Sequence, residues 1–457
     1  MYRFKFNGIA DNYDYSELIK IFLKPEEFVL EIESSEDDKT YIDIEIDCPQ
    51  KEDKNQIKRT IFLKLRELTG VNPPWGILTG VRPVKLTGEL LDKMGSEEAV
   101  YNHLKDFYLL SDEKANLLME TLNYQRLHLE RAEDNSVGVY IGIPFCPTRC
   151  LYCSFTSNQK GPKVIEKYLD SLLKEIEYAG SALDRAGMWT ESIYIGGGTP
   201  TTLSAEQLDI LIKAVKTFFN LEKCKEFTVE AGRPDTITAE KLNVLADHGI
   251  ERISINPQTM KDETLNLIGR SHSVDDIRKA FQLANSSGKF IINADIIAGL
   301  PDESAEDFKN TLEEVISLNP ANITVHTLAV KRASRLIETD EGYHYRQAKV
   351  VDEMLKISAD LLAKADYKPY YLYRQKHMAG ALENVGYCKN DTPCIYNIRI
   401  MDEHQSILAL GAGGISKRYY PAENRLERVP NVSNYEIYIE RLDEMIERKR
   451  LNFFEEV

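Results

Sequence analysis

Six short apolar runs alternate with helical stretches between residues 137 and 328, and this alternation restricts the possible folds more than any other feature of the sequence. The runs are rich in β-branched and aromatic residues and cover 137–144, 192–196, 226–231, 251–256, 290–299 and 321–328. Strands that alternate with helices form a parallel sheet with helical crossovers. Six strands favour a partial (β/α)6 barrel of the α/β class over a closed barrel of eight. In either form, chemistry is expected at the C-terminal ends of the strands.

The stretches between the runs carry helical signals. Capping boxes, which begin helices, are predicted at Ser204 with Gln207, Ser273 with Asp276, and Ser304 with Asp307. In "VIEKYLDSLLKEIEYAGSALDRAG", helical spacing predicts one apolar face. That face contains Ile165, Leu169, Leu172, Leu173 and Ile176.

Two flanking segments differ from this central pattern. Residues 1–130 begin with strand-like alternation and then become helical, which predicts an α+β domain to which the sequence assigns no chemistry. Residues 131–335 hold the partial barrel. Residues 336–457 are predicted to form a smaller C-terminal domain that covers the substrate.

Charge and the distribution of apolar residues exclude several classes of protein. The 457 residues include 28% charged residues and a net charge of −16, which argues against a nucleic-acid binder because such a protein needs a basic face. No run of eighteen apolar residues predicts a membrane span, and the N-terminus lacks the apolar region of a secretory signal. We therefore expect a cytoplasmic protein without a membrane partner, whose oligomeric state the sequence leaves open. Clustered cysteines in that compartment favour metal binding or redox chemistry.

Three of the seven cysteines lie together in "GIPFCPTRCLYCSF", directly after the first predicted strand. Cys146, Cys150 and Cys153 have the spacing of a loop that wraps around an inorganic centre. A structural zinc site needs four ligands, so Cys388 or Cys394 would have to supply the fourth. A two-cysteine switch leaves one thiol unexplained. The pattern favours an iron–sulfur cluster in which one iron has no protein ligand and is open to a substrate or cofactor.

A glycine-rich stretch, "YIGGGTPT", follows the second predicted strand. Glycines allow the backbone to approach a ligand closely. A phosphate-binding Walker loop would need Gly-Lys-Ser/Thr, and a dinucleotide fingerprint would need a third glycine where Thr201 stands. "GAGGIS" does not match the dinucleotide fingerprint either, because Ser416 occupies the position of the third glycine. We therefore predict that this loop, which contains Gly196, Gly197, Gly198, Thr199 and Pro200, binds a cofactor.

Polar residues recur at the later strand ends. Glu230 ends "TVE", Gln258 follows "SINP", and Asp295 interrupts the apolar "IINADIIAGLP". A charged residue within a parallel strand is unfavourable unless it has a partner, so Asp295 is predicted to be functional, with a structural salt bridge as the alternative. Arg270 in "LIGRSHS" is by composition equally consistent with a solvated helix end.

The cysteine pattern, with Tyr152 before its last cysteine, resembles the radical S-adenosylmethionine enzymes. The order of "YIGIPFCPTRCLYCSF", "GGGTPT", "VEAGRPDTIT", "ISINPQTM", "LIGRSHS", "NADIIAGLP" and "ALGAGGISK" resembles oxygen-independent coproporphyrinogen III oxidases over about residues 137–420, with an N-terminal extension like that of the HemZ-type branch. The resemblance implies a [4Fe-4S] cluster on Cys146, Cys150 and Cys153. It implies S-adenosylmethionine contacts from Tyr140, Gly197 and Glu230. It also implies a second S-adenosylmethionine or substrate group lined by Tyr152, Gly198, Thr199, Gln258, Arg270, Asp295 and Ala329.

The activity that the resemblance implies is oxidative decarboxylation of two propionates of coproporphyrinogen III, started by a 5′-deoxyadenosyl radical. An anionic tetrapyrrole substrate and a reducing donor such as flavodoxin or ferredoxin are the implied partners. Two basic stretches could supply the cations that hold the other propionates, because arginine side chains bind carboxylates well. The alternative is that both stretches are ordinary solvated surface. These stretches supply Lys331, Arg332, Arg335, Arg374, Lys376 and His377.

Two departures from the family pattern bear on the substrate. Gly142 stands where the oxidases typically have a histidine, and Ser154 stands where a fourth cysteine is common. A haem-binding chaperone and another tetrapyrrole-modifying radical enzyme, such as a haem-degrading methyltransferase, are therefore alternatives, as is a zinc-stabilised barrel without radical chemistry. Cys388 and Cys394 are expected to be free thiols.

Overall fold

A sheet of parallel strands forms the centre of the molecule, as the apolar runs predict. The computed structural model describes residues 1–7, 13–31, 41–47, 53–153, 157–329, 343–375 and 379–455. The central strands are β4 (Ser136–Ile143), β5 (Trp189–Gly197), β6 (Glu226–Glu230), β7 (Arg252–Ser254), β8 (Ile291–Ala298) and β9 (Asn322–Thr327). Each pairs in parallel with the next. The predicted α/β fold with a partial (β/α)6 barrel is confirmed.

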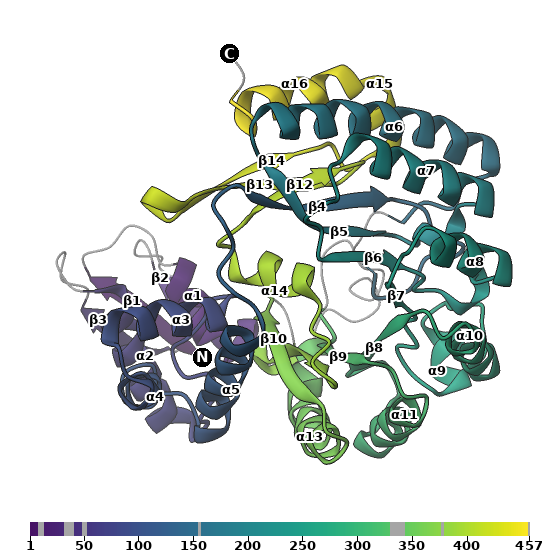
Figure 1. Cartoon of the computed structure of the whole chain (residues 1–457). Coiled ribbons are helices and arrows are strands. Elements are labelled where there is room, and N and C mark those ends of the chain that lie inside the picture. Colours follow the sequence, from purple (N-terminus) through teal and green to yellow (C-terminus); the bar gives the residue numbers. More distant parts are fainter. Residues whose placement is uncertain are drawn as a thin grey trace.

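Helices connect successive strands and cover the outer face of this sheet (Figure 1). They are α6 (Pro162–Arg185), α7 (Ala205–Phe218), α8 (Ala239–Asp247), α9 (Asp262–Leu267), α10 (Val274–Ser286) and α11 (Ala305–Ser317). The three predicted capping boxes begin α7, α10 and α11. The apolar face predicted for α6 also forms, because four of its five residues are buried and Leu173 is partly buried.

The C-terminal segment adds strands to both edges of the same sheet. Within the described ranges, the order is β10-β11-β9-β8-β7-β6-β5-β4-β12-β13-β14. At one edge β11 (Glu383–Cys388) is antiparallel to β9, and β10 (Lys368–Arg374) is antiparallel to β11. At the other edge β12 (Ser406–Leu410) is parallel to β4, and the antiparallel strands β13 (Ile415–Tyr420) and β14 (Arg425–Pro430) follow. The segment predicted as a smaller domain thus shares its sheet with the barrel.

The helix α14 (Ile395–Asp402) lies between β12 and β10, at the end of the barrel where the parallel strands begin (Figure 1). Glu226, the first residue of β6, accepts hydrogen bonds from the backbone N–H groups of Ile395 (3.0 Å) and Tyr396 (3.1 Å). Arg399 donates two hydrogen bonds to Glu191 of β5, at 2.7 and 2.9 Å. Since a carboxylate is favourable at a helix N-terminus, Glu226 both caps α14 and fixes it to the barrel.

A buried carboxylate on α6 joins the last helices to the barrel. These helices are α15 (Tyr435–Glu440) and α16 (Leu442–Asn452), which pack against α6, whereas α13 (Tyr343–Lys364) packs against α11. The carboxylate of Glu175 is fully buried and accepts four hydrogen bonds. The donors are the N–H of Gly411 (2.7 Å), Tyr438 (2.6 Å), Asn431 (2.8 Å) and Lys449 (2.7 Å).

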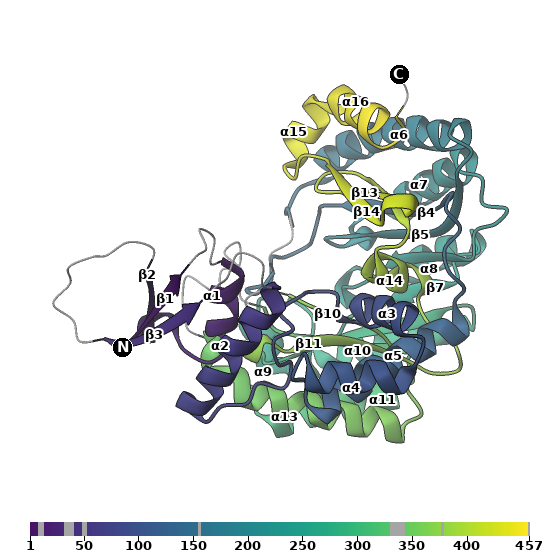
Figure 2. The same cartoon turned by 90° about the vertical axis from the view of Figure 1, so that its left-hand side faces the viewer.

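The N-terminal segment forms a second, small sheet beside the barrel (Figure 2). In the described part of this segment, β1 (Tyr2–Asn7), β2 (Phe28–Glu31) and β3 (Ile42–Asp47) are parallel, in the order β2-β1-β3. The helices are α1 (Tyr13–Ile19), α2 (Lys54–Thr69), α3 (Pro83–Met94), α4 (Glu97–Asp106) and α5 (Asp112–His128). Both α3 and α5 contact β10, so the segment packs on an edge of the barrel sheet.

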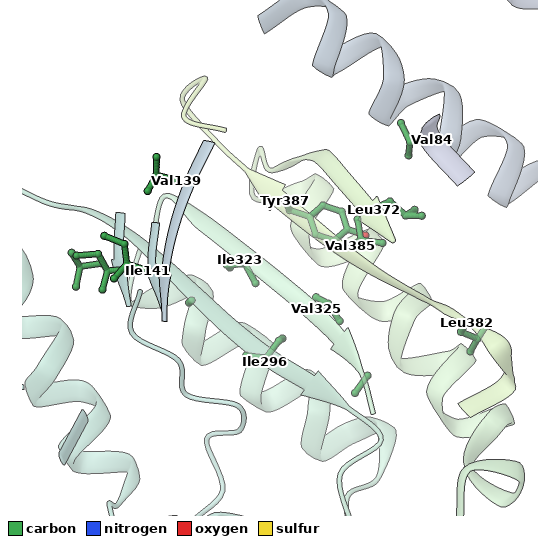
Figure 3. Packing of buried hydrophobic residues seen from close by; sticks show 14 of the residues in the cluster. Val84, Val139, Ile141, Ile296, Ile323, Val325, Leu372, Leu382, Val385 and Tyr387 are labelled. Atoms are coloured by element: carbon green, nitrogen blue, oxygen red, sulfur yellow. The ribbon is translucent and has the colours of Figure 1, made fainter. Parts of the chain in front are cut away.

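Side chains alternate between the two faces of the barrel strands. Those that pack against the outer helices are apolar and buried, such as Val139, Ile141 and Ile296 (Figure 3). Polar residues occupy the intervening positions, including Tyr140, Thr228 and Asp295. Parallel strands covered on both faces are usually apolar throughout, so a polar interior marks a place where a ligand binds. No helix in the described ranges is long and apolar enough to span a membrane.

Candidate active site

The cysteine loop begins where β4 ends and is fixed to neighbouring loops by hydrogen bonds. The N–H of Cys146 donates to the carbonyl oxygen of Asn158 (3.1 Å), and the N–H of Leu151 donates to that of Ile268 (2.9 Å). The hydroxyl of Thr148 donates to the carbonyl of Gly269 at 2.8 Å. The loop is therefore held against the connection between α9 and α10, at the C-terminal edge of the barrel.

The glycine loop after β5 lies directly against the cysteine loop. The N–H groups of Gly198 and Thr199 donate to the carbonyls of Ile143 and Phe145, both at 2.8 Å. A Cβ atom on Gly198 would lie 2.6 Å from the Phe145 oxygen and 2.9 Å from the Cys146 sulfur. Such contacts are too short for any side chain. The hydroxyl of Thr199 lies 3.4 Å from the same sulfur, so the two loops predicted to bind cofactors meet here.

Glu230, at the end of β6, lies in a group of tyrosines. The hydroxyl of Tyr194 donates to its Oε1 at 2.6 Å. Burial, helped by the nearby Asp295, raises the pKa of Glu230 to about 7, because hydrogen bonds from Tyr194 and the Gly197 N–H only partly oppose it. Tyr140 of β4 stacks on Tyr194 with 6.4 Å between ring centres. Glu230 can therefore be charged or neutral near neutral pH, according to what binds beside it.

The buried Arg270 contacts the half-buried Tyr152 near the cysteine loop. Arg270 donates to the carbonyl of Asn256 at 2.7 Å and to the Tyr152 hydroxyl at 3.5 Å. Burial raises the pKa of Tyr152, and the Arg270 cation opposes that increase. The Nε of Arg270 is buried and has no hydrogen-bond partner in the described structure. The arginine thus retains a donor for a bound group, which favours a functional role over a solvated helix end.

Gln258 and Asp295 are joined through the backbone. The N–H of Gln258 donates to the Asp295 carbonyl at 2.9 Å, although Gln258 has a left-handed φ of 68°. Such a conformation is unusual for a residue other than glycine, asparagine or aspartate. The carboxylate of Asp295 lies 3.5 Å from Nε2 of His326, whose Nδ1 lies 3.2 Å from the hydroxyl of Tyr373. Ala329 follows β9 and is half-buried, close to the start of the undescribed range 330–342.

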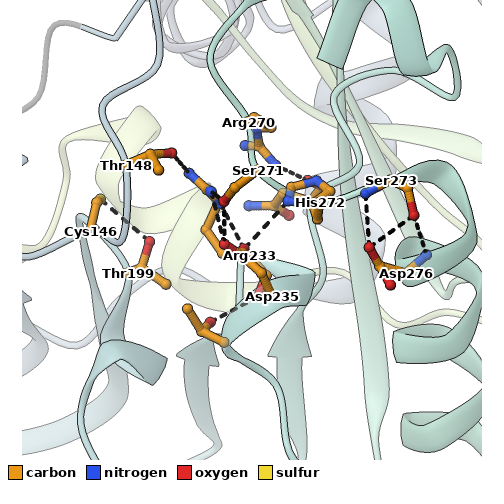
Figure 4. A network of polar contacts seen from close by, with 12 residues as sticks. Cys146, Thr148, Thr199, Arg233, Asp235, Arg270, Ser271, His272, Ser273 and Asp276 are labelled. Carbon is orange, nitrogen blue, oxygen red and sulfur yellow. Dashed lines mark hydrogen bonds and ion pairs between the residues drawn. The ribbon is translucent and has the colours of Figure 1, made fainter. Parts of the chain in front are cut away.

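A buried arginine behind the cysteine loop was not singled out by the sequence. Arg233 donates to both carboxylate oxygens of Asp235 at 3.0 Å (Figure 4). Its Nη1 lies 3.9 Å from the sulfur of Cys150. Burial opposes ionisation of Asp235, but hydrogen bonds from His272 and Arg233 outweigh it and hold its pKa well below the ordinary value. The only sequence signal for this pair is the Arg-x-Asp spacing in "GRPDT", and that spacing is not specific for a functional site.

Of the six cations expected to hold propionates, Arg374 alone lies within the described residues. Lys331, Arg332, Arg335, Lys376 and His377 lie outside the described residues. Arg374 is buried and donates to the backbone carbonyls of Leu78 and Ala381, so it joins the N-terminal segment to β10 instead of facing solvent.

A different group of cations surrounds a single carboxylate, that of Glu403. Its Oε1 lies 2.9 Å from Lys417, 3.8 Å from Arg82 and 3.7 Å from Arg428. Arg82 comes from the N-terminal segment, and its guanidinium also lies 6.0 Å from the centre of the Tyr373 ring. Sequence inspection missed this group because Arg82 lies more than 300 residues before the other three members.

The donor set at the cysteine loop fits a four-iron cluster. Cys146, Cys150 and Cys153 are free thiols, and burial raises the pKa of Cys146 to about 11, so binding iron would release its proton. In the described ranges, no three Cys, His, Asp or Glu side chains are placed to hold a single metal ion. A cluster instead takes each of the three thiolates on a different iron. The absence of a side chain on Gly198 leaves space beside the Cys146 sulfur, which a Cβ atom would approach to 2.9 Å.

The remaining cysteines of the C-terminal segment are free, as expected. Cys388 is buried and its thiol contacts the hydroxyl of Tyr124 at 3.2 Å. Cys394 is buried beside Glu226, with 3.2 Å between its sulfur and Oε1. Burial raises the pKa of both thiols. They lie with α14 and β11, at the opposite end of the barrel strands from the cysteine loop.

Comparisons with known proteins agree with this site. The family model of the radical S-adenosylmethionine superfamily matches residues 140–315. The oxygen-independent coproporphyrinogen-III oxidase-like protein HemZ of Bacillus subtilis is 40% identical over 423 residues, which cover 90% of this chain and 84% of that protein. The heme chaperone HemW of Haemophilus influenzae is 30% identical over 296 residues, 62% of this chain and 71% of that protein.

A solved structure, that of the coproporphyrinogen III oxidase HemN of Escherichia coli, has the same fold. It matches with a TM-score of 0.54 and 22% identity, and the match covers 72% of this chain and 73% of that one. The fold, the cysteine loop and the extent of the HemZ match lead to one assignment. The chain belongs to the radical S-adenosylmethionine superfamily, whose cofactors are a [4Fe-4S] cluster and S-adenosylmethionine, and within it to the oxygen-independent coproporphyrinogen III oxidase-like family, on its HemZ-like branch.

Proposed function

We propose that this protein converts coproporphyrinogen III to protoporphyrinogen IX without oxygen, as an oxidoreductase of haem biosynthesis. The observation that carries the proposal is the contact between the cysteine loop and the Gly198–Thr199 loop at the C-terminal edge of a barrel with a polar interior. Its cofactor arrangement suits radical chemistry, and its relatives include oxidases of this substrate.

In this proposal the cluster is held by Cys146, Cys150 and Cys153. Once bound, the cluster and S-adenosylmethionine supply a 5′-deoxyadenosyl radical that removes a hydrogen atom from the substrate. Tyr140, Gly197 and Glu230 hold S-adenosylmethionine. A second S-adenosylmethionine or a substrate group is lined by Tyr152, Gly198, Thr199, Gln258, Arg270, Asp295 and Ala329.

Glu230 is suited to an ammonium group, and Arg270 is suited to a carboxylate. A carboxyl with a pKa of about 7 loses its proton readily when an ammonium group binds beside it. The unpartnered Nε of Arg270 can donate a charge-assisted hydrogen bond to a carboxylate. The site thus offers a carboxyl group and a cation to bound groups. Gln258, which follows β7, is bridged to Ile296 of β8, next to Asp295 of the same strand.

The substrate has four propionates. Two of them would each give one hydrogen atom to the 5′-deoxyadenosyl radical, release CO2, and pass one electron to a one-electron acceptor. The other two must be held. Arg82, Lys417 and Arg428 provide three cations around one carboxylate, which leaves a local excess of positive charge in an acidic chain. Contacts through Tyr373 and His326 connect Arg82 to Asp295 in the barrel interior. We assign the retained propionates to this group.

Replacing Arg82 tests that assignment. The Arg82→Gln variant is expected to raise KM for coproporphyrinogen III about tenfold, because a lost charge-assisted hydrogen bond costs about 1.5 kcal/mol, and to leave kcat nearly unchanged. The matched control, Arg278→Gln, removes an exposed arginine that pairs with Glu314 on the outer helices. Unchanged KM in the Arg82 variant would remove Arg82 from the substrate site.

The implied partners are an anionic tetrapyrrole and a one-electron donor such as flavodoxin or ferredoxin, in the cytoplasm. We propose no nucleic-acid or membrane partner.

The test is anaerobic reconstitution with iron and sulfide, reduction, and addition of S-adenosylmethionine with and without coproporphyrinogen III. We expect substrate-dependent 5′-deoxyadenosine and tetrapyrrole masses lower by the loss of one and then two carboxyl groups. The Cys150→Ala variant should abolish both, and Cys224→Ser, which changes a thiol before β6, should abolish neither.

A second candidate is a haem-binding chaperone, favoured by the 30% identity to the heme chaperone HemW. It predicts stoichiometric haem binding by the reconstituted protein and unchanged coproporphyrinogen III. If haem is consumed instead, with S-adenosylmethionine cleaved, the protein is a haem-modifying radical enzyme. Zinc without iron after anaerobic purification would contradict the oxidase, the chaperone and the haem-modifying enzyme alike.

A further inference from the structure

Arg233 reaches from the end of β6 to the back of the cysteine loop. Its side chain is 4% exposed, and its guanidinium donates to the hydroxyls of Thr148 (3.0 Å) and Ser271 (3.1 Å). The same Nη1 that contacts Thr148 lies 3.9 Å from the sulfur of Cys150. Figure 4 shows Arg233 with Thr148, Asp235 and Ser271, between the cysteine loop and the loop that begins α10. Arg233 thus joins three strand-end loops.

The charge of Arg233 is balanced by one carboxylate. Asp235 receives two parallel hydrogen bonds from the guanidinium and a third from Ser271 at 2.8 Å. Asp235 is partly exposed, and together with His272 it lines a surface cavity of about 310 Å³. A bidentate pair of this kind fixes both the position and the orientation of the arginine. The cation is therefore next to the thiol, and its counter-charge lies on the far side, toward water.

We propose that Arg233 and Asp235 are positioning residues that fix the cysteine loop and set the reduction potential of the cluster that it holds. The inference rests on the proposed ligand role of Cys146, Cys150 and Cys153. Hydrogen bonds to cysteine sulfurs and the net charge nearby are two determinants of such potentials. A cation beside a ligand sulfur favours the reduced cluster, which carries one more negative charge, and a carboxylate favours the oxidised one.

Two substitutions should shift the potential in opposite directions. Arg233→Gln removes the cation and leaves Asp235, so the midpoint potential should become more negative. Asp235→Asn leaves the cation without its carboxylate, so the potential should become more positive. We expect about a tenfold change in the reduction equilibrium in each case, which is about 59 mV for one electron. Arg233→Lys keeps the charge and should lie closer to the wild type than Arg233→Gln.

The experiment is a redox titration of the reconstituted full-length protein, followed by the electron paramagnetic resonance signal of the reduced cluster. Iron content per chain is measured in parallel, and Arg278→Gln is the matched arginine control. Opposite shifts in the two variants, with full iron content and an unchanged control, support the proposal. Equal potentials in all variants overturn it.

Two further outcomes are decisive. If Arg233→Gln fails to retain iron, the potentials of Asp235→Asn and Arg233→Lys test the proposal instead. An unchanged potential in Asp235→Asn would overturn the electrostatic role. A shift of both variants in the same direction also overturns it, since it would report a general disturbance of the loop. The titration needs no substrate, so these results are independent of whether coproporphyrinogen III is converted. A wild-type protein that forms no cluster would instead contradict the proposed function.

Discussion

Gly198 lies where the glycine loop comes closest to the cysteine loop. We predict that Gly198→Ala displaces the Cys146 side of the loop, because the added methyl group would lie 2.6 Å from the Phe145 carbonyl oxygen. Forcing a group into such a contact costs about 1–3 kcal/mol. The iron bound per chain after anaerobic reconstitution should fall to less than half of the wild-type value.

Gly161→Ala is the matched control for this substitution. Gly161 precedes α6 at the other end of the same β4–α6 connection, and a Cβ atom there meets nothing within 4 Å. Full iron content in both variants would show that the loops can separate at little cost.

The raised pKa of Glu230 predicts that the stability of the folded protein depends on pH. Folding raises its pKa from 4.5 to about 7, so the folded protein holds this proton more tightly than the unfolded chain between those values. The stabilisation is present below pH 4.5 and is lost as the pH rises through 7. Glu230→Gln should therefore gain stability relative to the wild type by about 2 kcal/mol between pH 5.5 and 8.5.

Thermal unfolding of the S-adenosylmethionine-free protein at these two pH values measures the effect. The exposed Glu306, on the outer helix α11, supplies the control Glu306→Gln. A difference between Glu230→Gln and the wild type that does not change with pH would contradict a raised pKa.

At single residues, the sequence indicated the strand-end groups but not their partners. Glu230, Gln258 and Asp295 were visible because a polar residue in or after an apolar run is unusual. Arg233 and Arg82 were not, because an isolated arginine in a loop has no local pattern. Their roles arise from contacts with residues distant in sequence, such as Cys150 and Glu403.

At the level of elements, α14 depends on a carboxylate from another element. We predict that Glu226→Ala destabilises the protein by about 3–5 kcal/mol, because it leaves Arg252, 3.1 Å away, as a buried cation without its carboxylate. It also removes the N-terminal cap of α14. Amide hydrogen exchange should rise most in 395–402.

Asp352→Ala gives the comparison for this element. Asp352 pairs with Lys356 on the surface of α13, and such pairs contribute about 0.3–0.5 kcal/mol. If both variants unfold at the wild-type urea concentration, α14 is not anchored by Glu226.

The helices and the six barrel strands were predictable because their signals are local. A capping box lies within four residues, and a parallel-strand run is continuous. The placement of β10 to β14 was not predictable, because strand pairing depends on partners elsewhere in the chain. β12 pairs with β4, and β11 pairs with β9. The fold class was thus evident from the sequence, whereas the extent of its sheet was not.

For the whole molecule, the N-terminal segment and the barrel are joined through a buried ion pair. Lys114 of α5 lies 2.7 Å from Glu383 of β11, and both side chains are 2% exposed. Trp75 donates to the same carboxylate at 2.7 Å. We predict that Lys114→Met destabilises the protein by about 3–5 kcal/mol, and that the segment and barrel unfold in a single calorimetric transition.

A double variant separates the ion pair from its surroundings. Lys114→Met with Glu383→Gln should recover part of the loss, since glutamine still accepts the hydrogen bond from Trp75 and carries no charge. Two separate transitions in the wild type would show that the segment folds alone.

The buried Glu175 has a consequence for the order in which the protein is made. This carboxylate leaves the ribosome with α6, but its four donors lie between residues 411 and 449. Until those residues emerge, α6 cannot bury that charge, and the edge of β4 has no strand β12 beside it. The incomplete barrel sheet therefore keeps an unpaired edge at β4 until the C-terminal residues have been synthesised. An unpaired strand edge of this kind makes an incomplete chain prone to aggregation.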